Sequence, residues 1–168
     1  TIEVAYSEEG EILALRAEIY VDCGAYSVYP WTATMDGGMA LGILPGPYQI
    51  SNYECRSFSV TTNKCPLGPY RGVARPAACF SIERTMDKVA QALNMDPVEI
   101  RRRNLVKKDQ FPYTSVTGLV YDSGSFMESL DKVCELSDYE GLRRMQQEER
   151  TRGRYLGIGV ATYTEQTA

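Results

Sequence analysis

Histidine is absent from all 168 residues of the chain. Histidine is the commonest general base near neutral pH and a frequent metal ligand, so its absence excludes a Ser-His-Asp triad and an H-E-x-x-H zinc site. An excess of positive charge is also missing, because the chain has 18 basic and 22 acidic residues and a net charge of −4. Nucleic-acid-binding domains usually present a basic face, so we expect no nucleic-acid partner.

Long apolar runs and paired cysteines are lacking as well. No stretch approaches the roughly 18 consecutive apolar residues of a membrane-spanning helix, and no charged segment followed by an apolar one opens the chain. We therefore expect no membrane association and no signal peptide. The five cysteines are scattered, without a C-x-x-C pair or the spacings of zinc and iron–sulfur sites. This pattern predicts a cytoplasmic protein with reduced thiols and no metal held directly by protein ligands.

Alternating apolar residues place strands in the first part of the chain. Residues 2–6 and 12–22 flank a turn and predict a β-hairpin, with Leu13 among the residues of its buried face. Residues 53–63 follow the pattern of a further strand, and residues 155–163 that of a closing strand.

Helical spacing dominates the second part. A short helix is expected across residues 34–44, and a long helix over residues 76–94. Capping boxes at residues 96–99, 125–128 and 137–140 predict three further helix starts.

Strands come first, helices second, and one strand returns at the end. This order predicts an α+β fold, with an antiparallel sheet and helices packed on one side. We expect a single domain, 1–168, that is part of a larger cofactor-binding unit. Its parts are a strand-rich region (1–63), an arginine-bearing loop (64–76), a helix-rich region (77–152) and the closing strand (155–163).

The arginine loop, residues 64–76, has an unusual composition. It holds two glycines, three prolines and two arginines four positions apart. Proline fixes φ and removes a donor, whereas glycine lets the backbone bend sharply or approach a bound group. A glycine-bearing loop before a helix can offer N–H groups to an anion, and arginine adds a permanently charged planar fork. A tight turn with solvated arginines is the alternative that these residues leave open.

Four motifs occur in order along the chain: GPYQISN at 46–52, TNK at 62–64, YRGVARP at 70–76 and DPVEIRRRNL at 96–105. Together they resemble the molybdenum hydroxylases, the xanthine dehydrogenase and aldehyde oxidoreductase family, in their molybdopterin-binding large subunit. Ala74 and Ala77 depart from the family pattern, which has glycine and a glutamate or glutamine there.

The resemblance implies a molybdenum–molybdopterin cofactor whose dithiolene, rather than protein side chains, holds the metal. It implies hydroxylation of a small-molecule substrate, an aldehyde or an N-heterocycle, with water as the oxygen source. Iron–sulfur and flavin cofactors are then expected in partner subunits or domains.

The resemblance also assigns roles within the loop. Arg71 would be the catalytic residue beside the metal's ligand sphere, and Tyr70, Arg71 and Gly72 would bind the cofactor. Tyr70 would pack beneath the loop. Arg75 and Glu83 are expected to form a structural pair.

Val73 and Met39 are the expected substrate-pocket residues. Purine-oxidising members carry an aromatic residue at the position of Val73, and valine offers no ring for stacking. They carry an arginine near Met39, which cannot donate a hydrogen bond to a purine oxygen. Carbon monoxide dehydrogenases have a copper-binding cysteine where Gly72 stands. These differences imply an apolar pocket for an aldehyde or a less polar N-heterocycle.

The sequence lacks the family's general base, a glutamate in a late G-E-G motif, and its other cofactor-binding loops. We therefore expect an internal piece of a longer large subunit, inactive by itself and completed by the remainder of that subunit. Two alternatives stay open. One is a non-catalytic scaffold or interaction module with a purely structural loop. The other is an anion-binding protein using Arg71 and Arg75, which the acidic net charge disfavours.

Overall fold

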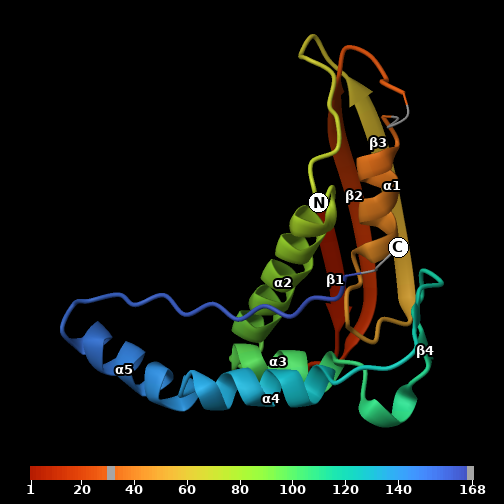
Figure 1. Cartoon of the computed structure of the whole chain (residues 1–168). Helices are drawn as coiled ribbons and strands as arrows, with labels where there is room; N and C mark the ends of the chain where they lie inside the picture. The colour runs from red at the N-terminus through yellow and green to blue at the C-terminus, as the bar shows by residue number, and fades with distance from the viewer. Residues whose placement is uncertain (30–32, 166–168) are drawn as a thin grey trace.

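A computed structural model describes residues 1–29 and 33–165. A tall, narrow sheet rises from a base of helices, and the chain's last segment crosses in front of it (Figure 1). β1 (Ile2–Tyr6), β2 (Ile12–Gly24) and β3 (Asn52–Thr61) form the sheet in that order. α1 (Met35–Ile43) and α2 (Arg75–Ala92) contact each other as well as the strands. The predicted α+β class, with helices on one side of the sheet, is confirmed.

The sheet is mixed rather than antiparallel throughout, which corrects one detail of the prediction. β1 and β2 form the expected antiparallel hairpin, but β2 and β3 pair in parallel. The reason is the long connection through residues 25–51, which contains α1 and carries the chain back to the end of the sheet where β2 began. Parallel neighbours require such a crossover, whereas a hairpin turn joins antiparallel strands.

A β-bulge changes which hairpin residues face inward. The register shifts between Ala5 and Tyr6, so the partner strand carries an extra residue opposite them. Ile12 and Leu15 are consequently both buried, and Leu13 is 47% exposed. The expectation that Leu13 lies on the buried face was therefore wrong.

The helical region begins as predicted. After α2 come α3 (Pro97–Asn104), the 3-10 turn η1 (Lys108–Gln110), the short strands β4 (Tyr113–Thr114) and β5 (Val120–Tyr121), α4 (Phe126–Leu136) and α5 (Tyr139–Thr151). Asp96 caps α3 by accepting hydrogen bonds from Val98 N and Glu99 N. The return bond of the predicted capping box is missing at this site, because the Glu99 carboxylate accepts from Arg103 Nε instead.

The other two predicted capping boxes are not formed either. Ser125 makes no capping bond to α4, because its hydroxyl lies 3.3 Å from the Ser129 hydroxyl instead. Asp138, rather than Ser137, caps α5 through the Gly141 N–H.

The core lies between the sheet and the helices. Its buried residues include Leu15 and Ala17 of β2, Ile82, Met86 and Val89 of α2, Ile100 of α3 and Leu130 of α4. Each large apolar side chain buried in this way contributes about 1.5–3 kcal/mol relative to exposure. The sheet, α2 and the base helices are therefore held as one unit. Among residues 1–29 and 33–165, no helix has the length and apolar character needed to cross a membrane.

Residues 155–163 do not form the predicted closing strand within this chain. The segment runs back from the end of α5 across α2 (Figure 1), but it pairs with no strand among the described residues. Ile158 and Val160 pack against the core instead. Side-chain packing therefore fixes this segment where strand pairing was expected.

Candidate functional site

The arginine loop reaches α2 through a pair of tight turns. Val73 N donates to Tyr70 O at 2.8 Å, and Arg75 N donates to Gly72 O at 2.9 Å. Gly72 has φ +100° and Val73 has φ +51°, both in the left-handed region. A β-branched residue there costs about 1–3 kcal/mol, so the surrounding structure must hold this turn in place.

The side chains of the loop point in different directions. Ala74 is the loop residue that packs inward, with 7% exposure. Tyr70 is 88% exposed, so the expectation that it packs beneath the loop was wrong. Arg71 is also exposed, and its side chain makes no hydrogen bond or ion pair with any other residue in the described part of the chain. Its guanidinium is therefore available to a group from outside this chain.

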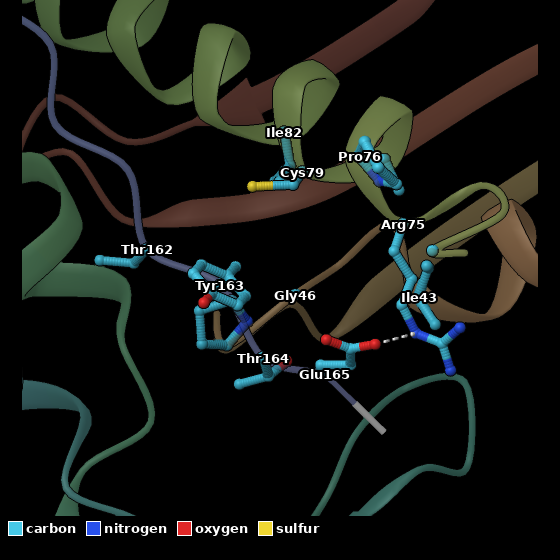
Figure 2. Close-up of a pocket in the computed structure, with 13 residues that line it drawn as sticks. Ile43, Gly46, Arg75, Pro76, Cys79, Ile82, Thr162, Tyr163, Thr164 and Glu165 are labelled. Carbon is cyan, nitrogen blue, oxygen red and sulfur yellow. Dashed lines mark ion pairs between the residues drawn. The ribbon is translucent and has the colours of Figure 1, made fainter. Parts of the chain in front are cut away.

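A cavity of about 260 Å³ lies beside the loop (Figure 2). Its lining comes from the loop, from α2, from the turn after α1 and from the extended final segment: Ile43, Gly46, Pro47, Gly72, Arg75, Pro76, Ala78, Cys79, Ile82, Thr162, Tyr163, Thr164 and Glu165. Most of these side chains are apolar or small. The charged groups of the lining are Arg75 and Glu165, which point toward one another (Figure 2).

Arg75 links three parts of the site. Its Nε lies 3.7 Å from Glu165 Oε1, and its Nη1 donates to Met39 Sδ at 3.3 Å. The predicted Arg75–Glu83 pair is therefore wrong. Because the Glu165 side chain is 59% exposed, its ion pair with Arg75 is worth about 0–1 kcal/mol. The structure brings Met39 to the loop through Arg75, while half-buried Val73 stands in the loop turn itself.

Glu83 is the centre of a buried polar network behind the cavity. Arg101 Nε donates to Glu83 Oε2 at 2.8 Å, and Tyr48 OH donates to Glu83 Oε1 at 2.5 Å. The Thr162 N–H donates to Glu83 Oε2 at 3.0 Å. Glu83 is 4% exposed and Arg101 is fully buried, and buried charges persist only when they are paired. The network thus joins α2, α3, the turn after α1 and the final segment.

Burial and charge set the protonation states around this network. Burial raises the pKa of Tyr48 well above its usual value, and the neighbouring Glu83 charge adds to this effect. Burial by itself would lower the pKa of Arg101, but the neighbouring charges of Glu83 and Asp87 and the hydrogen bond to Glu83 outweigh it and raise the pKa. Tyr48 therefore remains a neutral donor and Arg101 a cation at neutral pH. Burial also raises the pKa of the Cys79 thiol, which disfavours a thiolate nucleophile in the cavity.

Sequence reasoning missed the roles of Tyr48, Arg101 and Thr162. The first two lie inside motifs that carried the resemblance, GPYQISN and DPVEIRRRNL, and that position was the available signal. Nothing in the sequence pairs either of them with Glu83, because Tyr48 follows α1, Glu83 lies on α2 and Arg101 lies on α3, and only the packing of these three parts brings them together.

Comparison with known proteins then identifies the family. Residues 1–105 match the molybdopterin cofactor-binding domain family. The chain belongs to that family. It is 39% identical over 166 residues to the nicotine 6-hydroxylase large subunit of Paenarthrobacter nicotinovorans, an alignment that covers 98% of this chain and 20% of that protein. It is also 39% identical over 168 residues to the carbon monoxide dehydrogenase large chain of Hydrogenophaga pseudoflava, covering 97% of this chain and 21% of that one.

The fold agrees with that of solved members. Quinoline 2-oxidoreductase from Pseudomonas putida 86 matches with a TM-score of 0.91 and 35% identity, over 96% of this chain and 21% of that one. The resemblance drawn from the motifs is therefore confirmed. This chain spans about a fifth of the length of the relatives that it matches.

The residues present fit the cofactor of the molybdopterin-binding family. Gly72 needs its positive φ, and a Cβ there would meet Pro76 Cγ and Cδ at 3.4 Å. The loop therefore presents bare backbone at the cavity, one residue after the exposed Arg71, whose side chain does not line the cavity. Among the described residues, no group of three or more His, Cys, Asp and Glu is placed to hold a metal ion. A cofactor that carries its own metal ligands needs no such group.

Proposed function

We propose that this chain is part of an oxidoreductase large subunit that binds a molybdenum–molybdopterin cofactor and hydroxylates an N-heterocycle or an aldehyde with water as the oxygen source. The observation that carries this proposal is the arginine loop of a molybdopterin-binding family member bordering an apolar cavity. A non-catalytic scaffold is not favoured, because a purely structural loop gives no reason to keep a strained turn beside an open cavity.

Within this proposal, Arg71 is the catalytic residue and Tyr70, Arg71 and Gly72 contact the cofactor. When bound, the cofactor supplies oxygen-transfer and two-electron redox chemistry. Arg71, a permanently charged and exposed group, stabilises negative charge that develops at the reacting centre. Gly72 lets the backbone pass close to the bound group. The exposure of Tyr70 supports contact with something outside this chain.

The proposed substrate is a small, weakly polar ring compound. In this proposal Val73 and Met39, which do not line the cavity of Figure 2 but lie near Arg75, form an apolar side of the completed substrate pocket and offer neither an aromatic face nor a charge. Two of the similar proteins are named for N-heterocycles, nicotine and quinoline, which supports an N-heterocycle ahead of an aldehyde. Gly72, in place of a copper-binding cysteine, disfavours carbon monoxide.

The proposal also includes partners and location. Relatives are named as a large subunit, a large chain and a subunit of a dehydrogenase complex, so the similar proteins work in multi-subunit assemblies. We extend this to the present chain. Its partners are the remainder of its own subunit and subunits carrying iron–sulfur and flavin cofactors, and its location is the cytoplasm.

Steady-state kinetics on the complete enzyme would test this function. With quinoline, an aromatic aldehyde and xanthine compared under one set of conditions, we expect kcat/KM for quinoline to exceed that for xanthine by at least about tenfold, because an apolar pocket leaves the polar groups of a purine unpaired. The reverse order would contradict the assignment of Val73 and Met39.

A further inference from the structure

Residues 155–165 show the burial pattern of a β-strand. Leu156, Ile158, Val160, Thr162 and Thr164 are half-buried, and every residue between them is exposed. Alternation with a period of two is the signature of a strand that packs one face on a core. The inward side chains confirm this packing, since Ile158 and Val160 contact the main core.

The backbone of this segment lacks the pairing that a strand requires. Within residues 1–29 and 33–165, the backbone of residues 157–161 makes no hydrogen bond. The two backbone contacts on either side are made by Leu156 O, which accepts from Gln146 Nε2 at 2.7 Å, and by Thr162 N, which donates to Glu83. Exposed, unpaired strand edges are rare in folded proteins because they invite pairing with another strand.

The positions of these two contacts identify which edge is open. In a strand, the N–H and C=O of one residue point toward the same edge, and those of the next residue point toward the opposite edge. Leu156 and Thr162 lie six positions apart, an even spacing, so their contacts occupy one edge. Gly157, Gly159 and Ala161 present their N–H and C=O groups along the other edge.

The two glycines add an independent observation. Neither Gly157 nor Gly159 has a positive φ, and a Cβ at either position would meet no atom within 4 Å. Nothing within this chain therefore requires glycine there. Glycine within a strand often marks a place where another backbone approaches closely.

We propose that residues 155–163 are a strand of a second sheet and that they accept a partner strand along the edge formed by Gly157, Gly159 and Ala161. The occupant is a β-strand from the remainder of the same subunit, because the relatives of this chain are about five times its length. This inference rests on the proposed function only in taking the chain as part of a longer large subunit.

Residue-resolved hydrogen–deuterium exchange on the complete subunit tests the inference without any catalytic assay. Paired amides of a sheet exchange at least about 10²-fold more slowly than those of an unstructured peptide. We expect this protection at Gly157, Gly159 and Ala161. Exchange at the unstructured rate at these amides, with β2 still protected, would overturn the proposal. Protection that vanishes when the subunit is diluted to a monomer would also overturn it, since a second copy would then supply the partner strand.

A matched pair of variants separates the effect of losing the N–H donor from the effect of adding a side chain. Gly159→Pro removes the N–H at the open edge, while Gly159→Ala keeps it. We expect Gly159→Pro to abolish protection at Gly157 and Ala161, and Gly159→Ala to preserve it. Equal protection in both variants would overturn the proposal. If the wild-type subunit showed no hydroxylase activity while the amides of residues 157–161 were protected, the proposed function would be contradicted and the strand assignment would stand.

Discussion

Glu83 is hydrogen-bonded to several of the segments that surround the cavity. Its carboxylate receives hydrogen bonds from Arg101 of α3, from Tyr48 of the turn after α1 and from the backbone of Thr162. Arg101 is secured further by Asp87 Oδ1 at 3.0 Å and by the Pro97 carbonyl at 2.8 Å. One buried carboxylate therefore positions two walls of the site against α2.

Breaking this network should lower the free energy of unfolding substantially. Arg101→Met leaves the Glu83 charge buried without its cation, so we expect a loss of about 3–5 kcal/mol in the free energy of unfolding. Arg16→Met is the matched control: its ion pairs with Glu3 and Glu54 are exposed, so the loss should be about 0–1 kcal/mol. Urea unfolding followed by circular dichroism would measure both variants, and equal losses would contradict the role given to Glu83.

A second prediction for a single residue concerns the catalytic role of Arg71 in the complete enzyme. Arg71→Met should lower kcat by about 10²-fold, the usual effect of losing one preorganised electrostatic contact at a reacting centre. Arg84→Met, which removes an exposed arginine paired with Asp87, is the control and should leave kcat unchanged. If the folded Arg71 variant turned over at the wild-type rate, Arg71 would not be catalytic.

At the scale of elements, helix starts determine how the helical base is built. Asp96 satisfies two N–H groups of α3 and also accepts from Tyr139 OH at 3.0 Å, which ties α5 to the start of α3. Ser125 occupies the equivalent position before α4 but makes no capping bond. The two sites share a sequence signature and differ in geometry.

This difference predicts unequal responses to alanine. Asp96→Ala should reduce the free energy of unfolding by about 0.5–2 kcal/mol, whereas Ser125→Ala should change it by no more than about 0.5 kcal/mol. Asp96→Asn keeps a capping oxygen, so its loss in the free energy of unfolding should lie between those of Asp96→Ala and Ser125→Ala. Thermal unfolding of the three variants would show the order, and a larger loss for Ser125→Ala would contradict the capping geometry.

At the scale of the whole molecule, the site is assembled from widely separated parts of the sequence. The cavity joins the turn after α1, the arginine loop, α2 and residues 162–165. Nevertheless the chain spans about a fifth of the length of its relatives, and it lacks the G-E-G glutamate that the family uses as a general base. We therefore regard this cavity as one part of a larger active site.

The isolated 168-residue chain should consequently hold no stoichiometric molybdenum and show no hydroxylase activity. The complete subunit, produced with its partners, should contain about one molybdenum per large subunit. Elemental analysis of both preparations would check this. Stoichiometric molybdenum in the isolated chain would mean that the cofactor-binding groups present here suffice.

The sequence by itself determined the family, the α+β class, the hairpin and the long helix, because motif order and apolar periodicity are local properties. It also placed the loop glycine that the left-handed turn requires. Only the tertiary structure decided that Arg75 meets Met39 and Glu165 and that Glu83 meets Arg101. It likewise decided that β2 and β3 run in parallel. These are contacts between distant segments, and local periodicity carries no information about which buried charge will find which partner.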